Sequence, residues 1–400
     1  MSSAVPGPSG LRCAARRTWI VALLGAGGVA LAGCGSSGGG STPAASGGHS
    51  RVATVTITAA DGCAISSTSF PAGALTFNVT NKDANGVSEV ELQSGERIVG
   101  EKENLPPGFS GSFAVNVAAG KYTLYCPGAK QENTPLTVTG SSGSSAHSST
   151  TALLRTGTRD YAKYVTTQVG YLVRGARALD RALHGSSLST AQSAYEKARP
   201  FYEKIEPVAE SFTVGKNNLD ADIDARINDV PRSHFEGFHR IELGLFQRHS
   251  LAGLSGFGDG LVANVLKLQR LTDGLTYQPY ELANGAQELL DEVAASKITG
   301  EEERYSHIDL LDIEANDEGA EQAFADLQPG LATIDRSLSD EIAAKFRALD
   351  KLVDGYRTAS NPSGFEYFTT LTRADKRALA AAVKAVQEPL SQVASRVAKA

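Results

Sequence analysis

The spacing of apolar residues changes its period once along the chain, and this change decides the fold class. Between residues 51 and 139, apolar and polar residues alternate with period two in short runs separated by Gly, Asn and Pro. Such alternation is typical of β-strands with one buried face. From Thr151 onward the alternation disappears, and Ala, Leu, Glu, Lys and Arg dominate segments of helical period. The sequence therefore predicts a β domain followed by an α-helical domain.

Each predicted domain has an expected architecture. Short strands over 51–139 favour a Greek-key β-sandwich. The region 152–400 favours an all-α bundle or two four-helix bundles side by side, with Thr372 as a candidate N-cap. Flexible Gly/Ser-rich segments precede the two domains, as a tether at 34–50 and a linker at 140–151. The expected helices span approximately 152–184, 189–213, 231–249, 259–274, 278–297, 306–325, 331–358 and 373–399.

The first 33 residues have the organisation of a lipoprotein signal peptide. Three Arg form a positive n-region, and an apolar segment at 19–32 is too short and too rich in Gly for a membrane span. The sequence LAGC then ends at Cys34 in the order of a bacterial lipobox. We therefore expect lipid on Cys34 and an exported protein anchored at the outer face of the cytoplasmic membrane, in the periplasm or on the cell surface. The Arg16-Arg17 pair leaves both the general and the twin-arginine export routes open.

The charge balance narrows the range of partners. The chain has 44 Asp and Glu against 38 Lys and Arg, for a net charge of -6. The first 33 residues contribute three Arg and no acid, so the remainder is more acidic still. An acidic chain argues against nucleic acid and against an anionic membrane surface as partners. It is compatible with cations as ligands.

Two cysteines, Cys63 and Cys126, lie near the two ends of the predicted β domain. Outside the cytoplasm such a pair most often forms a disulfide, and the alternative is a thiolate site for a soft metal such as Cu(I). A blue-copper site requires two His and a Cys, usually with an axial Met. Residues 51–139 contain neither His nor Met, so this kind of site is excluded.

Four glutamates of the predicted β domain occur as two pairs. Glu89 and Glu91 flank one residue, and Glu101 and Glu103 repeat that spacing. In a strand, residues two apart lie on one face. Like charges on one face repel unless a cation lies between them. The pairs therefore indicate either a solvated outer face or a site for a hard cation such as Fe(III).

The strongest chemical signal of the predicted helical domain is the phrase GFHRIE at 237–242. His239 and Glu242 are three residues apart, so on a helix they share a face and can hold one ion. The phrase lacks the second His and the adjacent Glu of the His-Glu-x-x-His zinc peptidases. Other acids either converge on it across a helical bundle or cap helices and face solvent. These are Glu203, Glu206, Glu210, Asp220, Asp222, Asp224, Glu302, Asp309 and Asp312.

Together these residues resemble the EfeO family of iron-uptake proteins, in which a cupredoxin-like domain precedes a helical imelysin domain. The phrases that carry the resemblance extend over most of the chain after Cys34. In the β domain they are VEL, EKENLPPGFS and GKYTLYC. In the helical domain they are ARPFYEKIEPVAESF, LDADIDAR, GFHRIELGLF and KITGEEERYSHIDLLDIEANDEGA. The GxHxxE phrase is the imelysin signature.

The resemblance implies a non-enzymatic, lipid-anchored protein that binds iron, as Fe³⁺ or Fe²⁺, and delivers it to a membrane ferric permease. A haem-dependent peroxidase is the further partner that it implies. The implied metal ligands of the helical domain are His239, Glu242, Glu203, Glu206, Asp220 and Glu302. A second implied site comprises Cys63, Glu89, Glu91, Glu101, Glu103 and Cys126.

Two alternatives to iron delivery stay open at this stage. Imelysins are also classed as peptidases, which implies a metallopeptidase in which zinc would activate water. Glu242 would then be either ligand or base. The other alternative is copper-assisted oxidation or binding of iron at the cysteine pair. Some relatives have a Met two residues before the last Cys, where this chain has Leu124, so a thioether ligand is missing.

Overall fold

The computed structural model describes residues 51–87, 89–95, 97–103, 105–141, 149–214, 217–227 and 229–400. The expected signal peptide, the tether and Cys34 lie outside the described residues, as does most of the expected linker. Within the described ranges, no helix is both long enough and apolar enough to cross a membrane.

A two-sheet β region occupies residues 52–139, as the alternating pattern predicts. One sheet has the strand order β2-β1-β4-β7 and the other has the order β3-β9-β8-β5-β6. The β1–β4 and β3–β9 pairs are parallel, and the other pairs are antiparallel. The strands are β1 Val52–Thr58, β2 Gly62–Ile65, β3 Ser69–Pro71, β4 Gly73–Asn81, β5 Val90–Ser94, β6 Arg97–Lys102, β7 Ser110–Val117, β8 Gly120–Tyr125 and β9 Asn133–Thr139.

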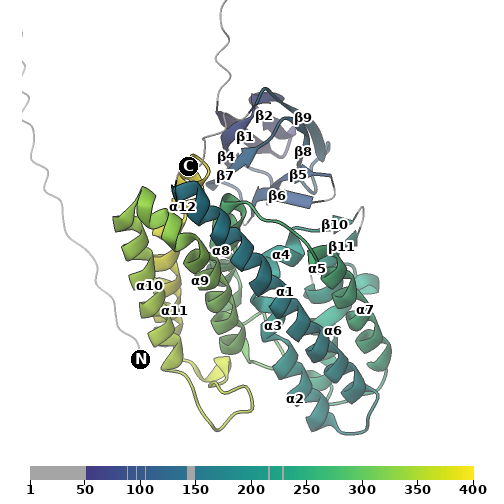
Figure 1. The fold of residues 1–400 in the computed structure, drawn as a ribbon. Helices are drawn as coiled ribbons and strands as arrows, with labels where there is room; N and C mark the ends of the chain where they lie inside the picture. Colours follow the sequence, from purple (N-terminus) through teal and green to yellow (C-terminus); the bar gives the residue numbers. More distant parts are fainter. Residues whose placement is uncertain are drawn as a thin grey trace, which may run out of the picture. The chain divides into compact units, whose positions relative to one another are not determined.

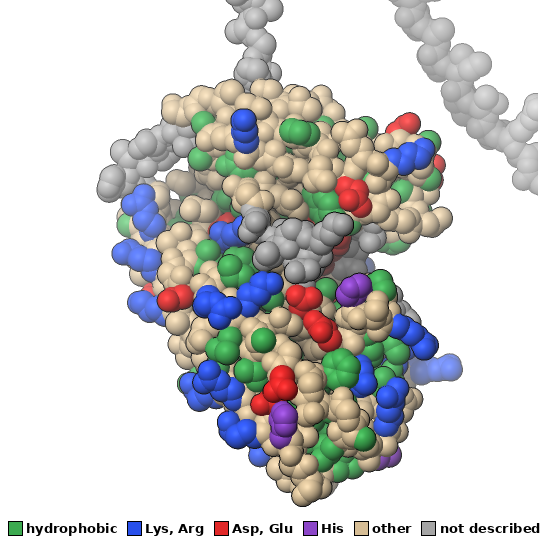
Figure 2. All heavy atoms as spheres, turned by 90° about the vertical axis from the view of Figure 1, so that its right-hand side faces the viewer, with side chains coloured by type: hydrophobic (Ala, Val, Ile, Leu, Met, Phe, Trp, Pro, Cys, Tyr) green, Lys and Arg blue, Asp and Glu red, His purple; other side chains and the backbone are tan. Residues whose placement is uncertain are grey.

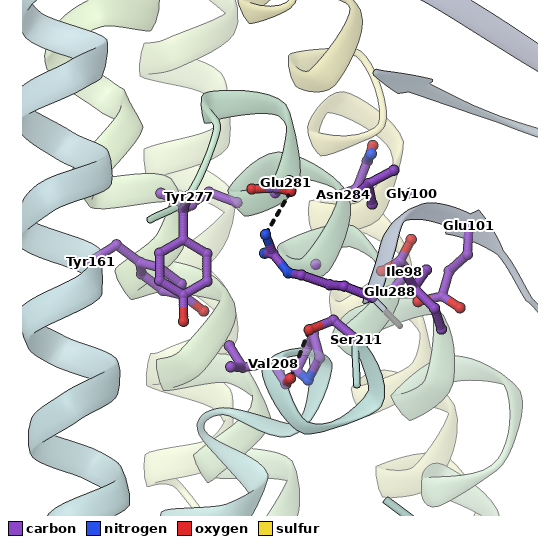
Figure 3. A pocket seen from close by; sticks show the side chains of 15 residues that line it. Ile98, Gly100, Glu101, Tyr161, Val208, Ser211, Tyr277, Glu281, Asn284 and Glu288 are labelled. Carbon is purple, nitrogen blue, oxygen red and sulfur yellow. Dashed lines mark hydrogen bonds and ion pairs between the residues drawn. The ribbon is translucent and has the colours of Figure 1, made fainter. Parts of the chain in front are cut away.

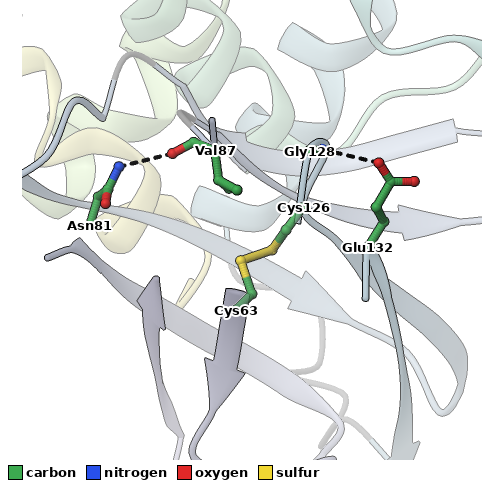
Figure 4. The surroundings of a disulfide bond; sticks show 6 residues. All are labelled: Cys63, Asn81, Val87, Cys126, Gly128 and Glu132. Carbon is green, nitrogen blue, oxygen red and sulfur yellow. Dashed lines mark hydrogen bonds between the residues drawn. A yellow bond between two sulfur atoms is a disulfide. The ribbon is translucent and has the colours of Figure 1, made fainter. Parts of the chain in front are cut away.

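The core of the β region is apolar and is closed by a disulfide. Phe77 on β4 stacks on Phe113 on β7, with ring centroids 4.7 Å apart. Cys63 on β2 and Cys126 after β8 are joined by a disulfide (Figure 4). The expectation that these two cysteines ligate a metal is therefore wrong for this structure, because a disulfide sulfur is not a thiolate and thiolates are the metal-binding form. Their disulfide alternative is confirmed.

The helical region extends from residue 149 to the C-terminus (Figure 1). Its longer helices are α1 Ser149–Leu183, α2 Leu188–Ala198, α7 Ser255–Thr272, α8 Pro279–Ala295, α9 Asp309–Ile334, α10 Arg336–Asp354 and α11 Arg373–Leu390. Its shorter elements are α3 Pro200–Glu203, α4 Glu206–Glu210, β10 Thr213–Val214, β11 Asn217–Asn218, α5 Leu219–Asp224, η1 Arg232–His234, α6 Gly237–Glu242, η2 Leu243–Gln247, η3 Lys297–Thr299, η4 Phe368–Thr370 and α12 Val393–Val397.

Two of the expected long helices are interrupted in the structure. The helix expected at 189–213 is divided into α2, α3 and α4, since Pro200 and Pro207 lack the N–H that a continuing helix needs. The helix expected at 231–249 consists of the short η1, α6 and the π-helical turn η2. Helix α1 begins at Ser149, so the end of the expected linker is helical. Thr372 caps α11 as expected, in a capping box with Asp375.

The helices pack in two groups that share α9. Helices α8, α9, α10 and α11 form a closed ring in which each helix contacts the next. Helix α1 packs on α2, α7 and α9, and the short elements α3 to α6 lie beside them (Figure 1). These short helices end and change direction where a long helix would continue. The ends of several helices therefore lie in the interior of the region. The functional candidates lie there.

The β region contacts the helical region through β6 and β7, which lie against α8 and α12 (Figure 1). Asn284 on α8 donates to the Ala114 carbonyl at 2.9 Å, and Asn116 donates to the Ala398 carbonyl at 2.9 Å. Arg97 forms an ion pair with Glu281 at 3.3 Å, at the pocket drawn in Figure 3. These contacts are polar and local, and both regions belong to one compact unit.

A buried acid on α9, Asp317, interacts with the half-buried Asp350 on α10 and leads to a first prediction. Asp317 is 3% exposed, and burial together with Asp350 raises the pKa of Asp317 to about 9. An acid whose pKa is higher in the folded state destabilises the fold increasingly as the pH rises from its unfolded value of about 4 toward 9. We expect Asp317→Asn to raise the free energy of unfolding at pH 8 and to have little effect at pH 4, because only the ionised carboxyl is penalised by burial. Urea unfolding at both pH values measures this.

The exposed Asp340→Asn on α10 is the matched control for Asp317→Asn, and we expect it to be neutral at both pH values. Equal effects of Asp317→Asn at pH 4 and pH 8 would contradict the assignment of a raised pKa to this carboxyl.

Candidate metal centre

His239 and Glu242 lie side by side in the interior of the helical region. Both are on α6 and almost completely buried, and His239 Nδ1 lies 3.4 Å from Glu242 Oε2. The other ring nitrogen, Nε2, lies 3.3 Å from Glu302 and 3.6 Å from Asp224. The spacing of three residues thus places both side chains on one helix face, as the sequence predicts. The imidazole therefore lies between Glu242 on one side and Asp224 and Glu302 on the other.

Backbone geometry holds α6 in this position. Gly237, the first residue of α6, has a φ of +74°, and a side chain there would overlap the Ile223 carbonyl of α5. Glu242 Oε1 accepts hydrogen bonds from the backbone N–H groups of Tyr305 and Ser306 at 2.7 and 2.8 Å. The loop after η3 therefore orients one oxygen of Glu242, and the other faces His239.

The carboxylates of this interior form three overlapping groups, in each of which one oxygen or nitrogen per residue lies within 4.8 Å of the others. The first group consists of His239, Asp224 and Glu302. The second group shares Asp224 and Glu302 with the first, and the third shares Glu206 with the second. The three groups are Asp224–His239–Glu302, Glu203–Glu206–Asp224–Glu302 and Glu206–Glu210–Glu292. Their ligand types, imidazole and carboxylate, suit iron and zinc.

Two buried basic side chains balance the charge of these acids. Arg199 and Lys297 are each completely buried. The carboxylates paired with Arg199 are Glu203 at 2.6 Å, Glu302 at 2.7 Å, Glu303 at 3.0 Å, Asp312 at 3.1 Å, and Asp224. Those paired with Lys297 are Glu206 at 2.6 Å, Glu203 at 2.9 Å, Glu292 at 3.6 Å and Glu302 at 3.8 Å. A buried charge without such partners would be strongly unfavourable.

The charges of the centre shift the pKa of its titratable groups. Burial disfavours the imidazolium, but Asp224 and hydrogen bonds to Asp224 and Glu242 outweigh this, so the pKa of His239 lies well above its usual value. Burial also disfavours the Glu302 carboxylate, but Lys297 and Arg226 hold the pKa of Glu302 well below its usual value. The neighbouring carboxylates thus favour the protonated imidazole, and a metal that binds it competes with that proton.

A pocket gives access to the centre. It is lined by His239, Glu242 and Glu302, together with Arg226 and Tyr305 nearer the surface. Figure 2 shows one face of the molecule, on which Lys and Arg side chains are spread around a few acidic ones. Much of the acidic excess of the chain is instead buried, in the set of carboxylates around Arg199 and Lys297.

Most sequence-predicted ligands of the helical region converge. His239, Glu242, Glu203, Glu206 and Glu302 all lie at or beside the centre. Asp220 lies at its edge, where it accepts a hydrogen bond from Tyr202 and burial raises its pKa to about 7. Of the other acids considered, Asp312 binds Arg199, and Asp309 accepts a hydrogen bond from the backbone N–H of Glu303 at 3.2 Å.

The sequence did not identify the basic residues of the centre. Arg199 precedes Glu203 by four residues, a spacing that also occurs in ordinary surface pairs on helices. Lys297 lies in the phrase KITGEEE, which is typical of the solvated end of a helix. Only their complete burial distinguishes them.

The four glutamates of the β region lie near one another, since Glu103, Glu91 and Glu89 add to the effect of burial in raising the pKa of Glu101. Glu91 on β5 lies opposite Glu101 on β6, and burial raises the pKa of Glu91 to about 7. Glu101 lines the pocket of Figure 3 together with Glu288 of α8. Among the described residues, no group of three metal-binding side chains includes these glutamates, Glu89, Glu103 or the cysteines. A site formed by the glutamates stays a prediction.

The fold and the centre define a class of protein: a two-sheet β region, followed by a helical region with a buried histidine–carboxylate centre. The chain belongs to the imelysin family, whose sequence profile, described as Imelysin, matches residues 157–393.

The curated relatives extend the similarity beyond the helical region. An iron uptake system component EfeO of Yersinia pestis is 37% identical over 328 residues, which cover 81% of this chain and 85% of the relative. The EfeO of Yersinia pseudotuberculosis serotype I matches at the same identity and coverage. The EfeO of Escherichia coli O1:K1 is 35% identical over 327 residues, 80% of this chain and 85% of the relative.

Proposed function

We propose that this chain is the extracytoplasmic iron-binding component of an iron uptake system, anchored by lipid on Cys34. It captures iron at the His239 centre and delivers it to a membrane ferric permease, with a haem-dependent peroxidase as a further component. The observation that carries the proposal is the buried imidazole of His239, with Glu242 on one side and Asp224 and Glu302 on the other, beside a second carboxylate group that includes Glu203 and Glu206. The names of the curated relatives support the uptake role.

The donor set favours iron as the cargo. Carboxylate oxygens with one imidazole suit Fe(III) and Fe(II), whereas Cu(I) prefers sulfur ligands. The cysteines that a copper role would need are joined in the disulfide. Iron, bound by ligands that also take up protons, can be released again, because protonation competes with the metal.

The geometry at Glu242 argues for binding and against peptide hydrolysis. A metallopeptidase requires a carboxylate that is free to take a proton from metal-bound water. One oxygen of Glu242 accepts two backbone N–H bonds and the other faces His239. An acid held in this way is suited to act as an oriented ligand. We therefore assign no catalytic activity to the centre.

The proposal is tested by titrating the full chain with ferric citrate and with Zn²⁺. We expect saturable binding of one ion at the centre. Loss of one good ligand is expected to weaken binding about 100-fold in His239→Ala, as is typical when a metal site loses even a supporting group. Calorimetry or competition with a coloured chelator measures the affinity.

His249→Ala is the matched control, because His249 is exposed and belongs to none of the groups of metal-binding side chains among the described residues. We expect this variant to bind metal like the wild type. Metal-dependent cleavage of casein that His239→Ala abolishes would overturn the proposal in favour of a peptidase.

A further inference from the structure

Lys297 occupies an unusual place in the centre. It begins the short helix η3 directly after α8, and its side chain is completely buried. Its ammonium donates to Glu203 at 2.9 Å and to Glu206 at 2.6 Å. Glu292 at 3.6 Å and Glu302 at 3.8 Å complete its set of carboxylate partners. A stable positive charge therefore lies among the acids.

The ammonium lies where the acidic groups overlap. Its four partners belong to the two groups that extend from the histidine, Glu203–Glu206–Asp224–Glu302 and Glu206–Glu210–Glu292. Glu206 is common to both groups and is its closest partner. In the metal-free protein, Lys297 thus supplies the positive charge that a metal ion bound by these carboxylates would supply.

Arg199 differs from Lys297 in a way that separates their roles. Arg199 also binds Glu303 and Asp312, which belong to none of the three groups, so its guanidinium is held from several sides. A lysine has a flexible four-carbon stem and a compact charge, whereas a guanidinium is planar and rigid. Of the two buried cations, Lys297 therefore has the more flexible side chain, and Arg199 is held by more partners.

We propose that Lys297 is an internal competitor for the metal ion. Its ammonium holds Glu203, Glu206 and Glu302 while the centre is empty and leaves them when the ion binds. When the metal ion binds, its double or triple positive charge replaces the single charge of the ammonium. Because the contacts of the ammonium with the carboxylates are lost, the net free energy of metal binding is less favourable than it would be without Lys297. The affinity of the centre is thereby set low enough for the ion to be released. This inference rests on the proposed function, because it assumes a metal at the same carboxylates.

The test compares Zn²⁺ affinity in the full chain carrying Lys297→Met or Lys297→Gln, both neutral and close to lysine in length. We expect each to bind Zn²⁺ at least tenfold more tightly than the wild type and to release it more slowly to a chelator. Lys297→Arg keeps the charge and is expected not to tighten binding. The exposed Lys351→Met on α10 is the control and is expected to bind like the wild type.

The outcomes separate this inference from the proposed function. Wild-type protein that binds neither Zn²⁺ nor ferric citrate would overturn both. Wild-type binding with unchanged or weaker affinity in the two neutral variants would overturn the inference alone, since a lysine that only supports the fold would give that result.

A second measurement serves if the neutral variants do not fold. Wild-type protein labelled with ¹⁵N-lysine is titrated with diamagnetic Zn²⁺, and the Lys297 ammonium resonance is assigned with Lys297→Arg. Displacement predicts that this resonance shifts in proportion to the bound Zn²⁺ while that of Lys351 does not. An unmoved Lys297 resonance at full occupancy would overturn the inference.

Discussion

Arg199→Met is expected to lower the free energy of unfolding of the metal-free protein by about 3–5 kcal/mol, the usual cost of removing one partner from a buried ion pair. Arg199 is completely buried and pairs with five carboxylates. Methionine fills much of the same space but leaves these charges uncompensated. The cost arises mainly from the repulsion among the acids that remain, because methionine replaces most of the packing of the arginine stem. Urea unfolding in the presence of a chelator measures the effect.

Metal should recover part of this loss in Arg199→Met. An ion that binds only the folded state stabilises it by mass action. In the variant, the ion also reduces the repulsion among the buried carboxylates, which Arg199 reduces in the wild type. We therefore expect Zn²⁺ to raise the melting temperature more in Arg199→Met than in the wild type. Arg177→Met, on the exposed face of α1, is the control and should be neutral. A destabilisation below about 1 kcal/mol would contradict the uncompensated charge, since surface changes fall in that range.

Gly237→Ala is expected to produce the second largest loss. The residue has a φ of +74°, which costs a residue with a side chain about 1–2 kcal/mol. The added methyl group would also overlap the Ile223 carbonyl, and overpacking of this kind costs about a further 1–3 kcal/mol. Because the clash is with backbone, α6 must move, and His239 moves with it. We expect lower stability together with weaker metal binding.

Gly256→Ala is the matched control for Gly237→Ala. Gly256 lies in α7 with open space around the position of a side chain, so alanine should be neutral or stabilising by up to about 1 kcal/mol. Thermal unfolding and Zn²⁺ titration of both variants measure the two effects. If Gly237→Ala is destabilised but binds metal with wild-type affinity, the position of His239 does not depend on the left-handed backbone conformation of residue 237.

The parts of the fold that the sequence predicted depend on local pattern. Period-two alternation marks the strands, and Thr372 caps α11 by a hydrogen bond within its own first turn. The prediction of one continuous helix at 189–213 was wrong, because the helix is interrupted at Pro200 and Pro207. The effect of proline on the backbone is also local, but a prediction based on the apolar pattern alone does not include it. The disulfide was foreseeable as one of two alternatives, because an oxidising compartment favours it, but its formation required Cys63 and Cys126 to be neighbours.

The sequence by itself determined the order of β and α regions and the pairing of His239 with Glu242, because both follow from the period of one segment. Only the tertiary structure decided which acids join that pair. Glu203, Asp224 and Glu302 come from α3, α5 and the loop after η3, and no spacing in the chain relates them. It also decided that Arg199 and Lys297 are buried counter-charges. The sign of a side chain's charge is written in the sequence, but its burial, which sets the energy of that charge, is a property of the packed molecule.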